Sequence, residues 1–126
     1  MKRIIFMVLT VALALLFVTG CAVNEKTGLI RFQNAATKDV TFKIGDVSVF
    51  VAKGAVYDYW LVADLKGEVS SKDCEALGKG AATFKVGYCY NITASTTLGK
   101  TFIGVGYGYQ SGVDTSDAKV HNPFDN

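Results

Sequence analysis

The sequence is poor in the residues on which most enzyme and metal chemistry depends. It holds one histidine, His121, close to the end of the chain, one proline and three cysteines. No cysteine and no second histidine stands near His121, so no metal-ligand cluster is recognisable, and no base is placed to activate a serine nucleophile. We therefore expect no enzymatic activity, no catalytic residues, no bound metal and no cofactor.

Basic charge is also scarce beyond the first twenty residues. The chain carries 13 Lys and Arg against 11 Asp and Glu, and Lys2 and Arg3 are the only charged residues in positions 1–20. Without those two, basic and acidic side chains balance at 11 each, and no basic cluster remains. Because non-specific affinity for nucleic acid comes mostly from neutralised phosphates, we expect no nucleic-acid partner.

The first twenty residues have the layout of an export signal. Lys2 and Arg3 precede a nearly continuous apolar run over residues 4–18. A helix of about fifteen residues rises about 22 Å, which is shorter than the roughly 30 Å hydrocarbon core of a membrane. The pattern therefore predicts a cleavable signal rather than a permanent membrane span.

A cysteine stands where this signal ends. Val18-Thr19-Gly20-Cys21 resembles the lipobox of bacterial lipoproteins, with Val18 in the place where that class most often has Leu. The resemblance implies a diacylglycerol on the sulfur of Cys21, cleavage between Gly20 and Cys21, and acylation of the new amino group by a fatty acid such as palmitate. Two or three acyl chains anchor a protein stably, at about 0.8 kcal/mol per buried CH₂. Ala22 replaces the Asp of an inner-membrane retention signal, which favours the outer membrane.

The rest of the chain predicts one β-domain. We expect a lipidated tether over 21–28, a β-domain over 29–110 and a polar, loosely ordered tail over 111–126. Residues alternate between apolar and polar, or are rich in branched and aromatic types, over 29–33, 40–44, 47–51, 56–62, 82–94 and 101–110. Gly45-Asp46 between two such runs predicts a tight hairpin with a type II′ or I′ turn.

These short strands and frequent turns predict an all-β fold, a small antiparallel β-sandwich or barrel. Residues 65–80 are ambiguous: a short helix near 70–78, capped by Ser70 or Ser71, and an ordered loop are equally consistent with the sequence. The strand spacing and the aromatic strands are loosely similar to those of immunoglobulin-like envelope modules.

Cys74 and Cys89 are the remaining cysteines. In an exported protein, an even pair of cysteines is typical of a disulfide, and we expect one here. The loop of about fifteen residues that it closes is worth roughly 3 kcal/mol in the chain-entropy model. A redox-active pair is the alternative, although the Cys-x-x-Cys spacing typical of such pairs is absent.

Tyrosines recur in three of the expected strands, together with the only tryptophan. The residues are Tyr57, Tyr59 and Trp60, then Tyr88 and Tyr90, then Tyr107 and Tyr109. We favour a structural role in cross-strand contacts, with Tyr107 and Tyr109 facing the core opposite three glycines. The alternative is a ligand-binding surface made by Tyr57, Tyr59, Trp60, Tyr107 and Tyr109.

Two functions are consistent with this sequence. The first is a lipid-anchored protein of the cell envelope that acts as a structural component, a surface antigen or an adhesin-like module, with the membrane and an envelope or host protein as partners. The second is a lipoprotein that binds a small molecule or a glycan at a tyrosine-lined site.

Overall fold

Alternation of buried and exposed side chains runs through eight strands of the computed structural model, which describes residues 27–107 and 121–125. The described residues contain no helix, so the predicted all-β class is confirmed. The strands are β1 (Gly28–Ala35), β2 (Val40–Ile44), β3 (Val47–Val51), β4 (Val56–Leu61), β5 (Leu65–Ser70), β6 (Ala81–Phe84), β7 (Cys89–Thr97) and β8 (Lys100–Tyr107).

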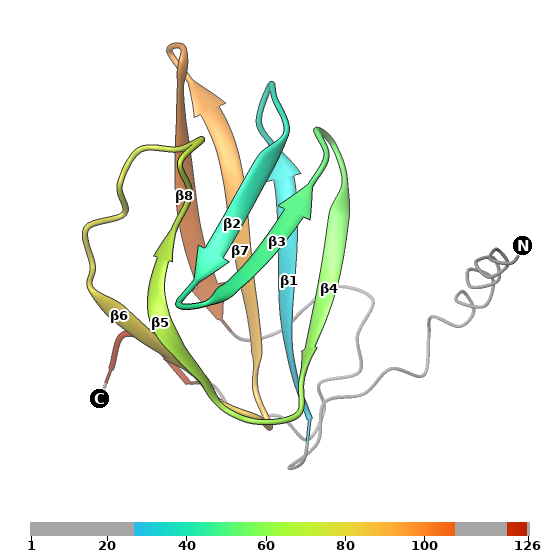
Figure 1. Ribbon diagram of the computed structural model, residues 1–126, viewed down its shortest axis with the longest axis vertical. Helices are drawn as coiled ribbons and strands as arrows, with labels where there is room; N and C mark the ends of the chain where they lie inside the picture. Colours follow the sequence, from blue (N-terminus) through green and yellow to red (C-terminus); the bar gives the residue numbers. More distant parts are fainter. Residues whose placement is uncertain (1–26, 108–120, 126) are drawn as a thin grey trace, which may run out of the picture.

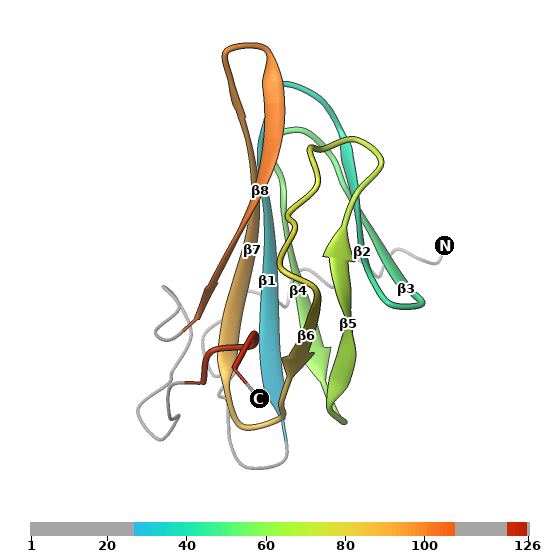
Figure 2. The same cartoon turned by 90° about the vertical axis from the view of Figure 1, so that its left-hand side faces the viewer.

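The strands form two four-stranded sheets that pack face to face as a sandwich (Figure 1; Figure 2). One sheet has the order β4-β1-β7-β8, and the other has the order β3-β2-β5-β6. Every pair is antiparallel except β1 and β7, which run parallel. The small β-sandwich is therefore the correct member of the two predicted architectures.

The core lies between the two sheets. Every second residue of β1 contributes to it, including Ile30 and Phe32, because side chains alternate across a strand. The Phe32 ring packs against Phe42 of the facing sheet, with 5.2 Å between centroids. Phe84 meets Tyr90 edge-on at 4.9 Å, and both rings are fully buried.

Two-residue turns close the β2–β3 and β7–β8 hairpins, whereas residues 71–80 form a longer connection between the antiparallel neighbours β5 and β6. In the β2–β3 turn, Gly45 has φ of +56° while Asp46 keeps a negative φ, and this pair of signs fits a type II′ turn. The hairpin predicted at Gly45-Asp46 is therefore confirmed. In the β7–β8 turn, Leu98 and Gly99 both have positive φ, at +54° and +79°, as a type I′ turn requires.

Residues 65–80 form a strand and a loop, so the short helix considered near 70–78 is wrong. Ser71 Oγ accepts the backbone N–H of Asp73, and the Asp73 carboxylate accepts the N–H of Thr41 on β2. Ser71, which suggested a helix cap, and Asp73 therefore form hydrogen bonds that stabilise a turn and bind strand β2. The preceding strand β5 contains Gly67, where a Cβ would lie 2.6 Å from Gly45 Cα, so this glycine permits close contact with the β2–β3 turn.

The single strand expected over 82–94 is divided into β6 and β7. The chain leaves one sheet after Phe84 and enters the other at Cys89. Gly87 has φ of +89°, which breaks the extended conformation, and its N–H bonds to Thr27 O. The alternation of apolar residues continues through this crossing, which explains why the sequence indicated one strand.

Candidate functional site

Tyr57 and Tyr59 are the predicted site residues that the structure brings together. They lie two positions apart on β4, opposite Phe32 and Ile30 of β1, so their side chains stand on the core-facing side of that sheet. Since β4 is an edge strand, the facing sheet covers them incompletely: Tyr59 packs partly against the core, and Tyr57 is 49% exposed.

The two rings border a groove on the side of the sandwich where the edge strands β3 and β4 lie. Its lining consists of Ser48, Val49 and Phe50 of β3 together with Tyr57 and Tyr59 of β4, and its volume is about 250 Å³. We call this feature the β3–β4 groove. Phe50 is 62% exposed beside it. None of the five lining side chains is charged at neutral pH, so the groove offers aromatic faces, two phenol hydroxyls and one serine hydroxyl.

Trp60 is separate from the two tyrosines. It is opposite Leu29 of β1 and points to the outer face of the sheet, where it packs with Leu29 and Cys89. The next residues of the same outer face are Arg31 and Asp58, which form a two-point ion pair with Nε–Oδ1 at 2.7 Å. The hydrogen bonds that Arg31 donates to the Asp58 carboxylate raise the pKa of Arg31. This face therefore carries a structural cross-strand cluster.

Tyr107 is also remote from the groove, because β8 is at the other edge of the same sheet. It is opposite the fully buried Tyr90 and so lies on the core-facing side, as expected. Its burial was predicted wrongly: Tyr107 is 45% exposed, because it ends an edge strand. Tyr109 lies outside the described residues. The five predicted residues therefore do not form one ligand-binding surface within the described chain.

The predicted disulfide is absent, and both Cys74 and Cys89 are free thiols. Glu75, next to Cys74, donates its N–H to Thr101 O at 2.7 Å, and Thr101 pairs with Thr96 on β7. Cys89 lies at the other end of β7, about 23 Å from Thr96 at about 3.3 Å per residue. A disulfide needs Cα atoms within about 7 Å, so the strand keeps the thiols apart.

Burial raises the pKa of both thiols further above neutral pH. Desolvation raises the pKa of Cys89 to about 11, against a smaller opposing effect of Arg31. Desolvation also raises the pKa of Cys74. Nucleophilic and redox chemistry of cysteine depends on the thiolate, so neither position has the environment of a reactive cysteine.

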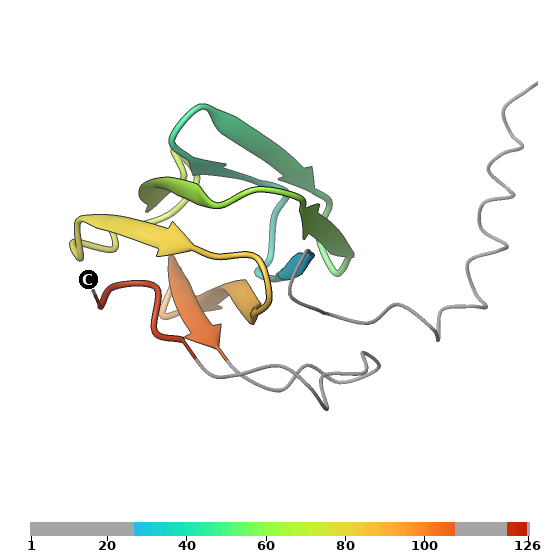
Figure 3. The same ribbon diagram turned by 90° about the horizontal axis from the view of Figure 1, so that it is seen from below.

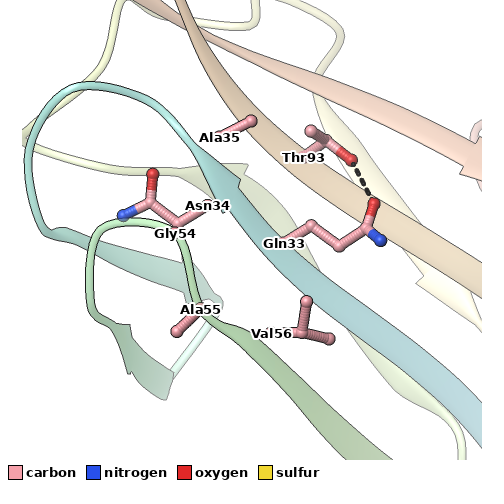
Figure 4. Close-up of a pocket in the computed structure, with 7 residues that line it drawn as sticks. All are labelled: Gln33, Asn34, Ala35, Gly54, Ala55, Val56 and Thr93. Atoms are coloured by element: carbon pink, nitrogen blue, oxygen red, sulfur yellow. Dashed lines mark hydrogen bonds between the residues drawn. The ribbon is translucent and has the colours of Figure 1, made fainter.

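A second pocket of about 320 Å³ lies where β1 approaches the start of β4 (Figure 4). Small side chains line most of it, and its polar groups bond within the protein. Gln33 Oε1 accepts the Thr93 hydroxyl hydrogen at 3.2 Å. Asn34 donates to the carbonyls of Lys38 and Val51 and accepts the N–H of Ala36. Asn34 therefore holds two loops together, and the β3–β4 groove is the better candidate site.

The sequence did not indicate how the last described residues are used. Residues 121–125 were expected in a loosely ordered tail, yet Pro123 is fully buried and its carbonyl accepts the N–H of Thr83 on β6. Phe124 packs against the core, and Lys79 lies over its ring at 5.4 Å. Figure 3 shows this segment in red beside β6.

His121 takes part in a partly buried hydrogen-bond chain. The Tyr90 hydroxyl accepts the N–H of Lys85 at 3.0 Å and lies 2.8 Å from His121 Nδ1. With Nε2 protonated, neutral His121 accepts the hydroxyl proton of Tyr90 at Nδ1. Burial raises the pKa of Tyr90 to about 12, and burial followed by the charge of Lys85 lowers the pKa of His121. These residues join the end of the chain to the core.

Other kinds of site find little support in the described part of the chain. Residues 27–107 and 121–125 contain no group of three or more His, Cys, Asp or Glu placed to hold a metal ion. The same residues include no helix long and apolar enough to cross a membrane. Gly20 and Cys21, the predicted cleavage and lipid-attachment residues, lie outside the described chain, as does most of the tether.

Comparison with solved structures supports the fold. No family model and no curated protein sequence matches the chain. The fold is similar to that of the C-terminal domain of AlgF from P. aeruginosa, with a TM-score of 0.51 and 16% sequence identity. The match covers 66% of this chain and 99% of that one. At this identity the likeness supports the sandwich fold alone.

Proposed function

We propose that the chain is a lipid-anchored bacterial lipoprotein of the cell envelope, placed at the outer membrane, whose β-sandwich acts as a binding or display module rather than as an enzyme. One observation carries the proposal: Cys21 follows a charged start and a short apolar run in the order that lipoprotein signals use. The sandwich begins at Gly28, so a short tether joins the lipid to the domain.

Metabolic labelling with palmitate tests the anchor. We expect the wild-type chain to be labelled, trimmed before Cys21 and recovered with the outer-membrane fraction. Cys21→Ala should remove the label and leave an unprocessed precursor, while Cys74→Ala serves as a matched cysteine control that keeps the label. If the Cys21→Ala chain is still trimmed after Gly20 and labelled, the lipobox assignment is wrong.

The side of the membrane is tested by adding protease to intact cells. Digestion of the domain in intact cells indicates a surface-exposed antigen or adhesin-like module. Protection until the outer membrane is permeabilised indicates an envelope component that faces the periplasm. The two results select between host partners and envelope partners.

A second candidate function is the binding of a small molecule or glycan at the β3–β4 groove. Tyr57 and Tyr59 lining one pocket favour it, because tyrosine offers both an apolar face and a polar hydroxyl. The volume of about 250 Å³ lies just below the range of about 300–1,000 Å³ typical of small-molecule sites. A thermal-shift screen against sugars tests this function, because a ligand at about 100 times its Kd adds about 2.7 kcal/mol of stability.

A further inference from the structure

Strand β3 leaves part of its backbone unpaired beside the groove. It pairs with β2 alone, and the two-residue turn makes Ile44 and Val47 a hydrogen-bonded pair. Hydrogen-bonded pairs then recur at every second position, so the N–H and C=O groups of Ser48 and Phe50 point away from β2. The N–H of Thr41, opposite Phe50, agrees with this pattern because it bonds to Asp73 instead of β3.

No hydrogen bond reaches those outward groups of Ser48 and Phe50 within residues 27–107 and 121–125. The four groups are spaced as an added strand requires, with the lining of the β3–β4 groove beside them. Unpaired edges of this kind bind extended polypeptides through main-chain hydrogen bonds, and adjoining pockets select the side chains.

The side chains beside this edge define the chemistry of a matching segment. Phe50 is 62% exposed and offers an aromatic surface to a neighbouring apolar side chain. Lys43 lies opposite Ser48, is exposed, and forms no ion pair within the described residues. Since Ser48 is small, it leaves room for the long Lys43 side chain to extend toward the added strand. A carboxylate there complements this charge.

We infer that the free edge of β3 binds an extended segment of a partner protein, which carries an acidic residue beside Ser48 and a branched or aromatic residue beside Phe50. The residue between them faces Tyr57 and Tyr59. This inference rests on the proposed role as a binding module, but it does not depend on the lipid anchor. The partner segment adds a fifth strand to the β3-β2-β5-β6 sheet.

Two other occupants fit the same edge less well. A glycan stacked on the tyrosines leaves the N–H groups of Ser48 and Phe50 without strand partners. A second copy pairs Ser48 with Phe50 across a two-fold axis, but β3 carries no carboxylate to meet Lys43. Both remain distinguishable outcomes of the experiment.

The experiment measures binding of a fluorescein-labelled capped peptide, Thr-Thr-Ile-Val-Glu-Thr-Thr, to the mature full-length protein in detergent, by fluorescence anisotropy. In antiparallel register Ile meets Phe50 and Glu meets Ser48. We expect a peptide N-methylated at Ile and Glu to bind about tenfold more weakly or worse, because it keeps the side chains and loses two donors. Equal binding of the two peptides overturns the inference, as does no binding of the parent at about 1 mM.

Two matched variants locate the site. Ser48→Pro removes an N–H that does not bond to β2, so we expect the protein to fold but to lose peptide binding. Ser48→Ala keeps this N–H and should retain binding. Lys43→Glu weakens binding of the peptide that carries Glu. The same variant strengthens binding of a peptide in which Lys replaces that Glu. Full peptide binding by a folded Ser48→Pro protein contradicts the inference. A Lys43→Glu protein that still prefers the Glu peptide over the Lys peptide also contradicts it.

The same assay separates the other occupants. Displacement of the peptide by a tetramer of N-acetylglucosamine, with equal affinity for both peptides, indicates a sugar site instead. A concentration-dependent dimer that Ser48→Pro dissociates, without peptide binding, indicates self-pairing. Palmitate labelling at Cys21 decides the anchor separately, so either proposal can fail without the other.

Discussion

The two sides of the sandwich where the sheets end in edge strands differ in how they are covered. On one side, β6 and β8 are the outer strands, and residues 121–125 cover β6 through the Thr83–Pro123 hydrogen bond. On the other side, β3 and β4 are the outer strands, and no described segment covers β3. We call these the closed side and the open side.

The comparison identifies the contacts by which an edge strand is covered in this protein. The closed side combines one main-chain hydrogen bond, the Phe124 ring packed against the core and the His121–Tyr90 contact. The open side provides the same kinds of group, main-chain atoms and aromatic rings, which no segment within residues 27–107 and 121–125 covers. Exposed edges invite pairing with other chains, and proteins usually protect them. An uncovered edge beside aromatic side chains is therefore consistent with a binding role.

The largest expected effect is on the closed side. Tyr90→Ala should lower the free energy of unfolding by about 3–5 kcal/mol, because it removes a fully buried ring that packs on Phe84. Urea denaturation measures the change. Tyr107→Ala, at a half-exposed position in the same pair of strands, should cost about 1 kcal/mol. Equal losses of stability for the two variants contradict the difference in burial between Tyr90 and Tyr107.

Removal of residues 121–126 should have the next largest effect, about 2 kcal/mol, from loss of the buried Pro123 and the packed Phe124. It also exposes the backbone of β6, so we expect concentration-dependent association in analytical ultracentrifugation. Phe124→Ala is the matched control, since it removes the ring and keeps the Thr83–Pro123 bond. A truncated chain as stable as the intact one refutes a structural role for this segment.

Acidification should lower the free energy of unfolding by a smaller amount, through His121 on the closed side. The pKa of His121 is lowered in the folded protein, so the unfolded chain takes up its proton at higher pH. The stabilisation is complete above the unfolded pKa of about 6.5 and is lost as the pH falls through the folded value. Burial and Lys85 favour the neutral ring, whereas Asp125 and Asp64 oppose them.

Chemical denaturation at pH 7 and pH 5 measures this dependence. The wild-type protein should lose more stability between the two pH values than His121→Gln, which cannot be protonated. An identical pH dependence in both proteins shows that His121 does not couple to folding.

The smallest effect on stability is expected on the open side. Tyr57→Ala should change the free energy of unfolding by less than about 1 kcal/mol, because the ring is half exposed. The same substitution should weaken binding of the peptide Thr-Thr-Ile-Val-Glu-Thr-Thr, so binding and stability are separable at this position. A loss comparable to that of Tyr90→Ala places Tyr57 in the core instead.

Local sequence signals predicted much of this fold. Alternation located β1, β2, β3 and β8, branched and aromatic residues located β4, and Gly45-Asp46 located a turn. These signals succeed because strand faces and tight turns depend on neighbouring residues. Strand β5 was missed because its central residue is Gly67, which the close approach of Gly45 requires. That requirement comes from residues distant in sequence and leaves no local pattern.

The candidate site was predicted in part for the same reason. Tyr57 and Tyr59 were identified as site candidates, but the contributions of Ser48 and Phe50 depend on how two edge strands meet. The disulfide prediction was wrong because the number of cysteines does not reveal that β7 separates the two thiols. His121 gave no signal of its structural partner, Tyr90, which lies 31 residues away.

The position of β1 affects the order in which the chain folds. This first strand lies between β4 and β7, and its parallel neighbour comes 60 residues later, as the Gln33–Thr93 contact shows. Such distant pairing costs loop-closure entropy before it contributes stability, and sandwiches with this property fold in milliseconds to seconds. A chain that emerges from its amino terminus therefore keeps β1 unpaired on one side until residues 89–97 have followed.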